Sequence, residues 1–367
     1  MSSHRNLPRP LSKRPSTGGS RCPGLVLEAH QIRQTLASGR NGQLALRAAG
    51  LLGGFRALVL PGGEASRVLD RHAVVHWDVA DEAEGGRPEV DRGQLRDLLL
   101  DSLPEDTVHW GRMATGARPL GAGRHEVTFA DGTAVTTDLL VGADGAWSRV
   151  RSLLSDARPV HSGISFVEAD LRDADTRHPY EAALVGNGML FALAEGKGFL
   201  AHRETDGSLH VYTALTAAED WLDTIDFADA NRSKAGVLAR FDGWDASLKT
   251  LVANADGRLT PRKINVLPVG HRWNRVPGVT LLGDAPHLMS PFAGEGANLA
   301  MLDGAELGQA LAAHPNNPEK ALTVYEEALF PRSAEKAAES AAGLEMCFGE
   351  PVSQLLRLFT DTLTVTD

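Results

Sequence analysis

Apolar runs that end in glycine or aspartate alternate with helical patterns along this chain, and one junction between the two is more distinctive than the rest. Residues 279–282, Val-Thr-Leu-Leu, form a largely apolar run that stops at Gly283 and Asp284, and an Ala/Leu-rich helical pattern starts near Gly296. This order predicts a buried strand, a tight corner and a helix. Asp284 would then stand at the strand end, and the first amides of the helix would face an electron-rich carbonyl or a phosphate.

The first half of the chain is predicted to alternate between helices and short hairpins. Helical periodicity covers residues 42–52 with a stop at Gly50, and a second helix opens after Asp91 as its N-cap and runs to residue 100. Strands are predicted as a hairpin over 68–77, at 107–110, on either side of Gly123 and of the turn at 131–132, and at 139–142.

The second half is predicted to hold a sheet followed by helices. Alternating and apolar runs with polar turns give strands at 164–171, 190–193, 198–202 and 209–215. Helical patterns follow at 299–313, 319–330 and 333–343, with a helix break at 315–318. His202 and Arg203 end a strand and could face a substrate, although a structural role is the simpler interpretation.

Composition restricts the classes of partner. Hydrophobic residues make up 43% and charged residues 23% of the 367 residues, and the net charge is −10. Residues 1–40 carry seven basic side chains against one acid, so the rest of the chain is strongly acidic. Nucleic acid is therefore not an expected partner. No apolar run is long enough to span a bilayer, and Cys22 and Cys347 indicate neither disulfides nor zinc. A cytoplasmic protein, expected to be monomeric, is predicted.

The segment from Gly283 to Asn298 reads Gly-Asp-Ala-Pro-His-Leu-Met-Ser-Pro-Phe-Ala-Gly-Glu-Gly-Ala-Asn. It resembles the Gly-Asp motif of the FAD-dependent aromatic hydroxylases, the class of para-hydroxybenzoate hydroxylase, and is most similar to the tetracycline-inactivating flavin monooxygenases. The resemblance implies that this segment binds FAD. The implied cofactor-binding residues here are Gly283, Asp284, Pro291, Gly294, Gly296, Ala297 and Asn298.

Two further matches support the same resemblance. Residues 139–151 contain Gly-Ala-Asp-Gly, which resembles the Asp-Gly motif of the class, and Asp144 matches the acid linked there to both FAD and nicotinamide binding. Arg92 and Leu95 reproduce an Arg-x-x-Leu pattern whose arginine reaches the flavin in that family. Arg92 and Asp144 are therefore added to the implied FAD-binding residues. A solvated surface arginine and an ordinary strand-end turn are the alternatives.

The beginning of the chain departs from the family pattern. The family's Gly-x-Gly-x-x-Gly loop, which holds the FAD pyrophosphate, occurs nowhere in this sequence. Residues 1–35 are rich in Ser, Pro, Arg and Gly and are expected to be disordered or non-native, either as a transit peptide or because the start is misplaced. Glu28 follows an apolar triplet and could pass for the acid that binds the adenosine ribose, but no dinucleotide loop precedes it.

The resemblance implies an α/β fold: a Rossmann-like FAD-binding domain (36–157 and 267–313) with its first βαβ unit incomplete, an inserted, mostly antiparallel substrate-binding sheet (158–266), and C-terminal helices (314–367). It implies no catalytic side chain and no metal, because FAD carries the chemistry. NADPH would reduce FAD, and O₂ would give a C4a-hydroperoxide that hydroxylates an aromatic or tetracycline-like polyketide substrate. The alternative is a non-catalytic remnant or binding module unable to hold FAD.

Overall fold

The computed structural model describes residues 35–37, 39–59, 65–79, 88–194 and 196–349. The predictions for residues 1–34, Glu28 included, and for the last residues of the C-terminal segment lie outside these ranges. Within the described residues, no helix combines the length and the apolar character needed to cross a membrane.

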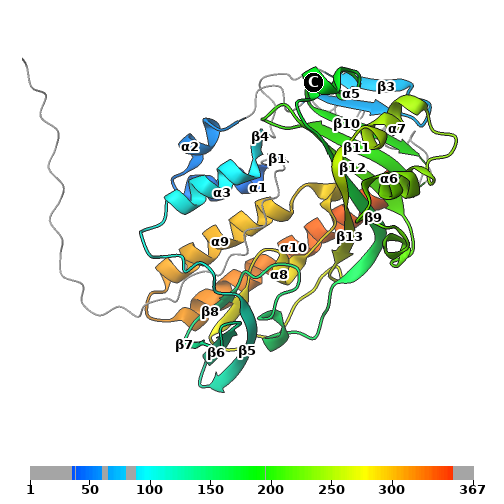
Figure 1. Ribbon diagram of the computed structural model, residues 1–367. Helices are drawn as coiled ribbons and strands as arrows, with labels where there is room; N and C mark the ends of the chain where they lie inside the picture. The colour runs from blue at the N-terminus through cyan, green and yellow to red at the C-terminus, as the bar shows by residue number, and fades with distance from the viewer. Residues whose placement is uncertain (1–34, 38, 60–64, 80–87, 195, 350–367) are drawn as a thin grey trace, which may run out of the picture.

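A seven-stranded sheet dominates one end of the molecule (Figure 1). Its order is β13-β9-β12-β11-β10-β2-β3, and all neighbouring pairs are antiparallel except β10 with β2. The strands are β2 (Ser66–Leu69), β3 (Val75–Val79), β9 (Val160–Leu171), β10 (Met189–Ala194), β11 (Lys197–Arg203), β12 (Leu209–Thr216) and β13 (Asp256–Val266). The predicted hairpin and all four strands predicted within 164–215 are therefore confirmed.

Three smaller sheets lie away from it. Strands β8 (Leu140–Gly142) and β14 (Val279–Leu281) form a parallel pair. Strands β5 (Ala114–Gly121), β6 (Arg124–Phe129) and β7 (Ala134–Thr137) form the two predicted hairpins, and β1 (Thr35–Ala37) pairs antiparallel with β4 (Glu89–Asp91). Because β8 and β14 are parallel, the two sequence motifs that follow them lie at the same end of this pair of strands.

Side chains cap the starts of α3, α6, α7 and α10. Asp91 accepts a hydrogen bond from the amide of Gln94 at the start of α3, as predicted, and Gly50, with φ +74°, follows α1. The longer helices are α1 (Arg40–Ala48), α3 (Arg92–Asp101), α6 (Ala230–Leu238), α7 (Ala246–Ala253), α9 (Gly296–Ala313) and α10 (Pro318–Phe348). The short ones are α2 (Leu52–Arg56), α4 (Ala174–Arg177), α5 (Pro179–Val185), α8 (Asp284–His287), η1 (Arg151–Leu153), η2 (Trp221–Thr224) and η3 (Pro291–Ala293).

The large sheet is buried on both faces. Helices α6 and α7 cover one face, where Phe199 stacks on Phe241 with ring centroids 4.4 Å apart. The other face packs against η3 and the end of α10, with Phe166, Leu193 and Phe292 in one apolar cluster. Because side chains alternate along each strand, one set of residues on each strand points towards η3. We call this second surface the inner face.

Two predicted elements are wrong. Residues 107–110 form an irregular loop and no strand, because Asp106 takes a positive φ of 63° and the Thr107 hydroxyl donates to the Pro104 carbonyl at 2.7 Å. The two helices predicted over 319–343 are one helix, α10, with Pro331 inside it. Tyr325 before this proline and Ser340 after it are both buried, so packing on both sides offsets the roughly 3 kcal/mol cost of an interior proline.

Candidate active site

The corner after β14 is fixed by its backbone. Val279 and Leu281 are fully buried, and Leu282 N–H donates to the Gly142 carbonyl at 2.9 Å, which extends the pairing with β8. Gly283 follows with φ +67° and ψ −139°, a conformation essentially restricted to glycine. A Cβ at Gly283 would also lie 3.2 Å from the Ala300 Cβ. The sequence therefore needs glycine here for two separate reasons.

A buried carboxylate on α9 holds the same corner. Asp303, with 0% exposure, accepts from Gly283 N–H at 2.9 Å and lies 2.6 Å from Nε2 of His287. Its other oxygen accepts from Arg332 of α10 at 2.8 Å, and Arg332 also pairs with Glu306. His287 is thus hydrogen-bonded within the corner, as a structural residue is. Asp303 and Arg332 were missed, because they stand in helical stretches without a motif.

Asp284 differs from its buried neighbours. Its side chain is exposed, and within the described part of the chain no donor hydrogen-bonds to its carboxylate. A Cβ at Gly296 would lie 3.9 Å from Asp284 Oδ1, so the carboxylate stands beside the first residue of α9. Glu295 precedes that helix without capping it through its side chain. A carboxylate and a helix N-terminus therefore lie together and are open to a polar ligand.

The loop between α8 and α9 is compact. Pro291 begins η3, and Gly294 ends it with φ +62° and ψ +22°. The Asn298 side-chain amide donates to the Gly294 carbonyl at 3.0 Å, which fastens the loop to α9. From the other side, Gly39 approaches so closely that a Cβ there would lie 2.9 Å from the Glu295 carboxylate. Ala297 lies between these contacts and is half-buried. The seven motif residues thus share one corner and one loop.

The second motif is joined to the first by an arginine. Arg151 is buried and donates to the carbonyls of Ala285 at 2.8 Å, Ala146 at 2.7 Å and Ala157 at 3.2 Å. Burial lowers the pKa of Arg151, and the nearby charge of Asp144 partly opposes that effect. Arg151 therefore ties the loop after β8 to the turn after β14.

The Asp144 carboxylate forms hydrogen bonds within its own turn. Its carboxylate accepts from the Ser148 hydroxyl at 2.6 Å and from the amides of Arg149 at 2.6 Å and Val150 at 3.3 Å. These contacts shape the segment that leads into η1. They leave a contact between Asp144 and a cofactor as a prediction.

Arg92 is the exposed first residue of α3, and it lies close enough to the large sheet to act on Tyr212 of β12. Burial and the charges of Glu168 and Glu204 raise the pKa of the Tyr212 phenol, and the charge of Arg92 opposes this rise. The positive charge of Arg92 therefore acts on Tyr212 of the inner face.

The inner face carries His202, which the sequence offered as a substrate contact beside a structural role, and further residues that the sequence did not single out as functional. Tyr212 contacts Phe166, with ring centroids 5.4 Å apart, and Phe166 contacts Phe292 of η3 edge-on at 5.9 Å. His202 and His210 lie next to Tyr212, with centroids at 6.0 and 4.6 Å. A line of rings therefore runs from the loop to a pair of histidines. The alternation of polar residues at 202, 210 and 212 was the available signal. Arg203, by contrast, points away and pairs with Asp175 at 3.1 Å.

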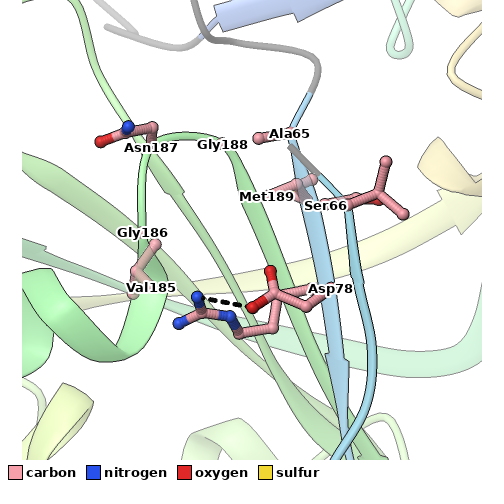
Figure 2. A pocket seen from close by; sticks show the side chains of 10 residues that line it. Ala65, Ser66, Asp78, Val185, Gly186, Asn187, Gly188 and Met189 are labelled. Atoms are coloured by element: carbon pink, nitrogen blue, oxygen red, sulfur yellow. Dashed lines mark hydrogen bonds and ion pairs between the residues drawn. The ribbon is translucent and has the colours of Figure 1, made fainter. Parts of the chain in front are cut away.

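A cavity of about 400 Å³ lies at the edge of this sheet, between β2, β3 and the loop from α5 to β10 (Figure 2). Among the described residues that line it, Arg67 and Asp78 are the charged ones; they pair at 2.9 Å, and Arg67 also donates to the carbonyls of Ala183 and Leu184. None of the predicted cofactor residues lines it. Arg67 and Asp78 already form bonds within the protein, so the described lining offers a ligand mainly apolar surface.

Comparison with known families identifies the chain. The FAD binding domain family matches residues 124–340, which include β8, the large sheet except β2 and β3, and the whole corner and loop. The chain belongs to this family. It is 30% identical over 345 residues to Monooxygenase penA of Penicillium thymicola, covering 80% of this chain and 79% of that protein. It is 28% identical over 259 residues to an FAD-dependent urate hydroxylase of Mycolicibacterium vanbaalenii, covering 69% and 62%.

Solved structures of flavoproteins share the fold. Klebsiella pneumoniae HpxO complexed with FAD and uric acid matches with a TM-score of 0.72 and 22% identity, covering 92% of this chain and 85% of that one. The tetracycline destructase Tet(51) matches with a TM-score of 0.68 and 18% identity, covering 93% and 88%. The predicted family and fold class are confirmed. The protein is an FAD-dependent monooxygenase, and the comparisons do not favour the non-catalytic alternative.

The described residues of this flavin monooxygenase fit the flavin half of FAD. Asp284 offers a carboxylate that no described group occupies, Gly296 leaves space beside it, and the start of α9 has no side-chain cap. Sugar-like hydroxyls suit the carboxylate, and an electron-rich ring edge suits the helix N-terminus. The sequence contains no Gly-x-Gly-x-x-Gly loop, so no contact is derived for the adenosine half.

Proposed function

We propose that this FAD-dependent monooxygenase uses NADPH and O₂ to hydroxylate an aromatic or tetracycline-like polyketide substrate. The observation that carries the proposal is the contact between the loop and the inner face of the sheet: Phe292 of η3 touches Phe166, which touches Tyr212. A planar substrate bound on this face would lie next to the loop. Aromatic and apolar walls with a few polar groups are usual for such sites.

The proposed cofactor contacts follow the motifs. Asp284 would accept hydrogen bonds from the ribityl hydroxyls, and the amides of Gly296 and Ala297 would stabilise negative charge on the ring system. Gly283, Gly294 and Asn298 would shape the loop, and Pro291 would form its outer wall. Arg92 and Asp144 would approach the same group from α3 and from the loop after β8. When bound, FAD supplies the redox chemistry with NADPH and O₂, while these residues position it and limit access of water.

The remaining assignments belong to the same proposal. The acidic charge balance and the two cysteines of the sequence suit a monomer in the reducing cytoplasm. Residues 36–157 and 267–313 would form the FAD-binding domain, residues 158–266 the substrate-binding domain, and residues 314–367 the C-terminal helices.

The first experiment is a visible spectrum of the purified, desalted chain before and after FAD is added. The proposal expects flavin bands that survive desalting, followed by NADPH oxidation that tetracycline, salicylate or 3-amino-4-hydroxybenzoate accelerates. Parallel assays with NADH test the choice of nicotinamide. A preparation that stays colourless after incubation with FAD would contradict the proposal.

A further inference from the structure

The inner face of the sheet changes from apolar to polar along its strands. Next to η3 the cross-strand row contains Leu193, Ala214 and Phe166, and all three belong to the apolar cluster. Two residues further along β12 the row contains Tyr212, and the next row pairs His202 with His210. A ligand lying on this face with one end at the loop would therefore meet polar groups only at its other end.

We propose that His202 and His210 form a subsite that binds an acidic hydroxyl, phenol or enol, of the substrate and accepts its proton. This inference rests on the proposed function, because it concerns the substrate of the same site. It adds two residues that touch the substrate to a reaction in which no side chain had a predicted chemical role.

Each histidine is held by a carboxylate. Nε2 of His202 lies 2.9 Å from Oε1 of Glu204, and Nδ1 of His210 lies 2.6 Å from Oδ1 of Asp170. An ionised carboxylate can only accept, so each of these ring nitrogens carries the proton. In the neutral imidazole of each residue, the opposite nitrogen, Nδ1 of His202 or Nε2 of His210, is then an acceptor.

These acceptors lack partners although they are buried. His202, Glu204 and His210 are only 4%, 6% and 7% exposed. Within the described part of the chain, His202 Nδ1, His210 Nε2 and Glu204 Oε2 have no hydrogen-bond partner. A buried polar atom without a partner costs free energy, so a protein rarely retains three side by side without a ligand to satisfy them. The two ring centroids are 5.6 Å apart, which suits one or two neighbouring hydroxyls.

The groups around the two histidines would stabilise a substrate hydroxyl that loses its proton. Tyr212 stays protonated, because burial and the charges of Glu168 and Glu204 raise its pKa, and its hydroxyl can donate to a bound oxyanion. Arg92 adds a positive charge from α3, and Arg262 neutralises Glu168 at 3.1 Å. In the proposed step the substrate O–H bond breaks and an N–H bond forms on one imidazole. The products are an oxyanion and an imidazolium, so the net charge is unchanged and no electron is transferred.

The cavity at the edge of the sheet is linked to the histidines through the strand register, although neither histidine lines it. Met189 is the cross-strand neighbour of His202, and Met189 and Ser66, its partner on β2, both line the cavity of about 400 Å³ (Figure 2). This volume is within the range of small-molecule pockets. The row Ser66, Met189, His202 and His210 therefore joins the wall of the cavity to the histidine pair across the sheet.

The test compares two probes that differ by one ionisable proton, 4-nitrophenol and its methyl ether 4-nitroanisole. Binding to the FAD-loaded enzyme is measured by calorimetry, and ionisation of the bound phenol by difference absorption. The wild type is expected to bind 4-nitrophenol at least about tenfold more tightly and in its ionised form, because only that probe satisfies the acceptors. His202→Gln with His210→Gln should abolish both the preference and the ionised band. Glu204→Gln, which releases the His202 tautomer, should reduce them.

His161→Gln is the matched control, because His161 lies in the same sheet but pairs with Ser165 at 3.1 Å, away from the cluster. It should keep the wild-type preference, and the melting temperature and FAD content should show that every variant is folded. An unchanged preference in the double variant, or equal binding of both probes by the wild type, would overturn the inference. A retained preference without NADPH oxidation would instead contradict the proposed function.

Discussion

The corner after β14 and the inner face of the large sheet both belong to the candidate active site, but they are built differently. The corner depends on backbone: Gly283 takes a conformation closed to other residues, and its amide is held by the buried Asp303. The inner face depends on side chains projecting from regular strands, such as His202 and Tyr212. A regular strand tolerates many side chains, whereas the corner does not. Substitutions at the corner should therefore change stability or cofactor binding, and substitutions on the face should change substrate choice.

The largest effect is expected for Asp303→Ala. This change removes the acceptor of Gly283 N–H and one of the two carboxylates that pair with the partly buried Arg332. Breaking such a network costs about 3–5 kcal/mol of unfolding free energy. Urea denaturation measures the loss, with Glu306→Gln as a milder control, because Glu306 is more exposed. Equal denaturation midpoints for Asp303→Ala and wild type would show that the buried network does not hold the corner.

Asp284→Ala should leave stability unchanged but weaken FAD binding. Loss of a hydrogen bond to a charged group costs about 1.5–3 kcal/mol, roughly a tenfold to hundredfold rise in the dissociation constant. Fluorescence quenching of added FAD measures this constant. Asp242→Ala, another exposed aspartate, is the control. If both variants bind FAD like the wild type, Asp284 does not contact the cofactor.

Gly283→Ala should destabilise the protein by about 1–3 kcal/mol, because alanine is strained at φ +67° and ψ −139° and its Cβ would crowd Ala300. Gly304→Ala is the matched control within α9, where a Cβ would meet no atom within 4 Å. Helix propensity predicts that this control gains about 0.5–1 kcal/mol. Thermal melts of the two variants should move in opposite directions, and a shared direction would contradict the strain at the corner.

The smallest effect concerns pH. His271 Nδ1 donates to the Pro286 carbonyl at 2.6 Å, its Nε2 lies 2.9 Å from the Ser155 hydroxyl, and burial with the charge of Arg151 lowers its pKa below 6.5. A lowered pKa in the folded state means that the unfolded chain binds the proton more readily. Stability is therefore retained above about pH 6.5 and lost as the pH falls below it. His271→Gln should reduce the change in melting temperature between pH 7 and pH 5. His109→Gln, at an exposed position, should leave this change as it is in the wild type.

The sequence predicted the two regions unequally. The corner could be recognised because Gly283, Asp284 and the following glycines are needed at fixed spacings for backbone reasons. The strands of the sheet were also predicted, since alternation and turn residues are local signals. The cluster of His202, His210 and Glu204 was not, because it exists only once β11 and β12 are paired in register.

Long-range contacts account for the other differences between the predictions from the sequence and the structure. The bond from Arg151 to the Ala285 carbonyl, 134 residues away, has no local signature in the sequence. The sequence predicted a helix end at residue 330, but α10 continues through Pro331 because buried residues on both sides of the proline pack against other elements. In both cases local preference is outweighed by tertiary packing.

The edge-on contact between Phe292 and Phe166 makes one wall common to the loop and to the inner face. If FAD and a substrate both contact this wall, their binding affinities are thermodynamically linked. Whatever factor a substrate contributes to the affinity for FAD, FAD must return to the affinity for that substrate. A screen that records how much each candidate compound raises the melting temperature of the FAD-loaded protein, relative to the protein without FAD, would therefore rank substrates before any turnover is measured.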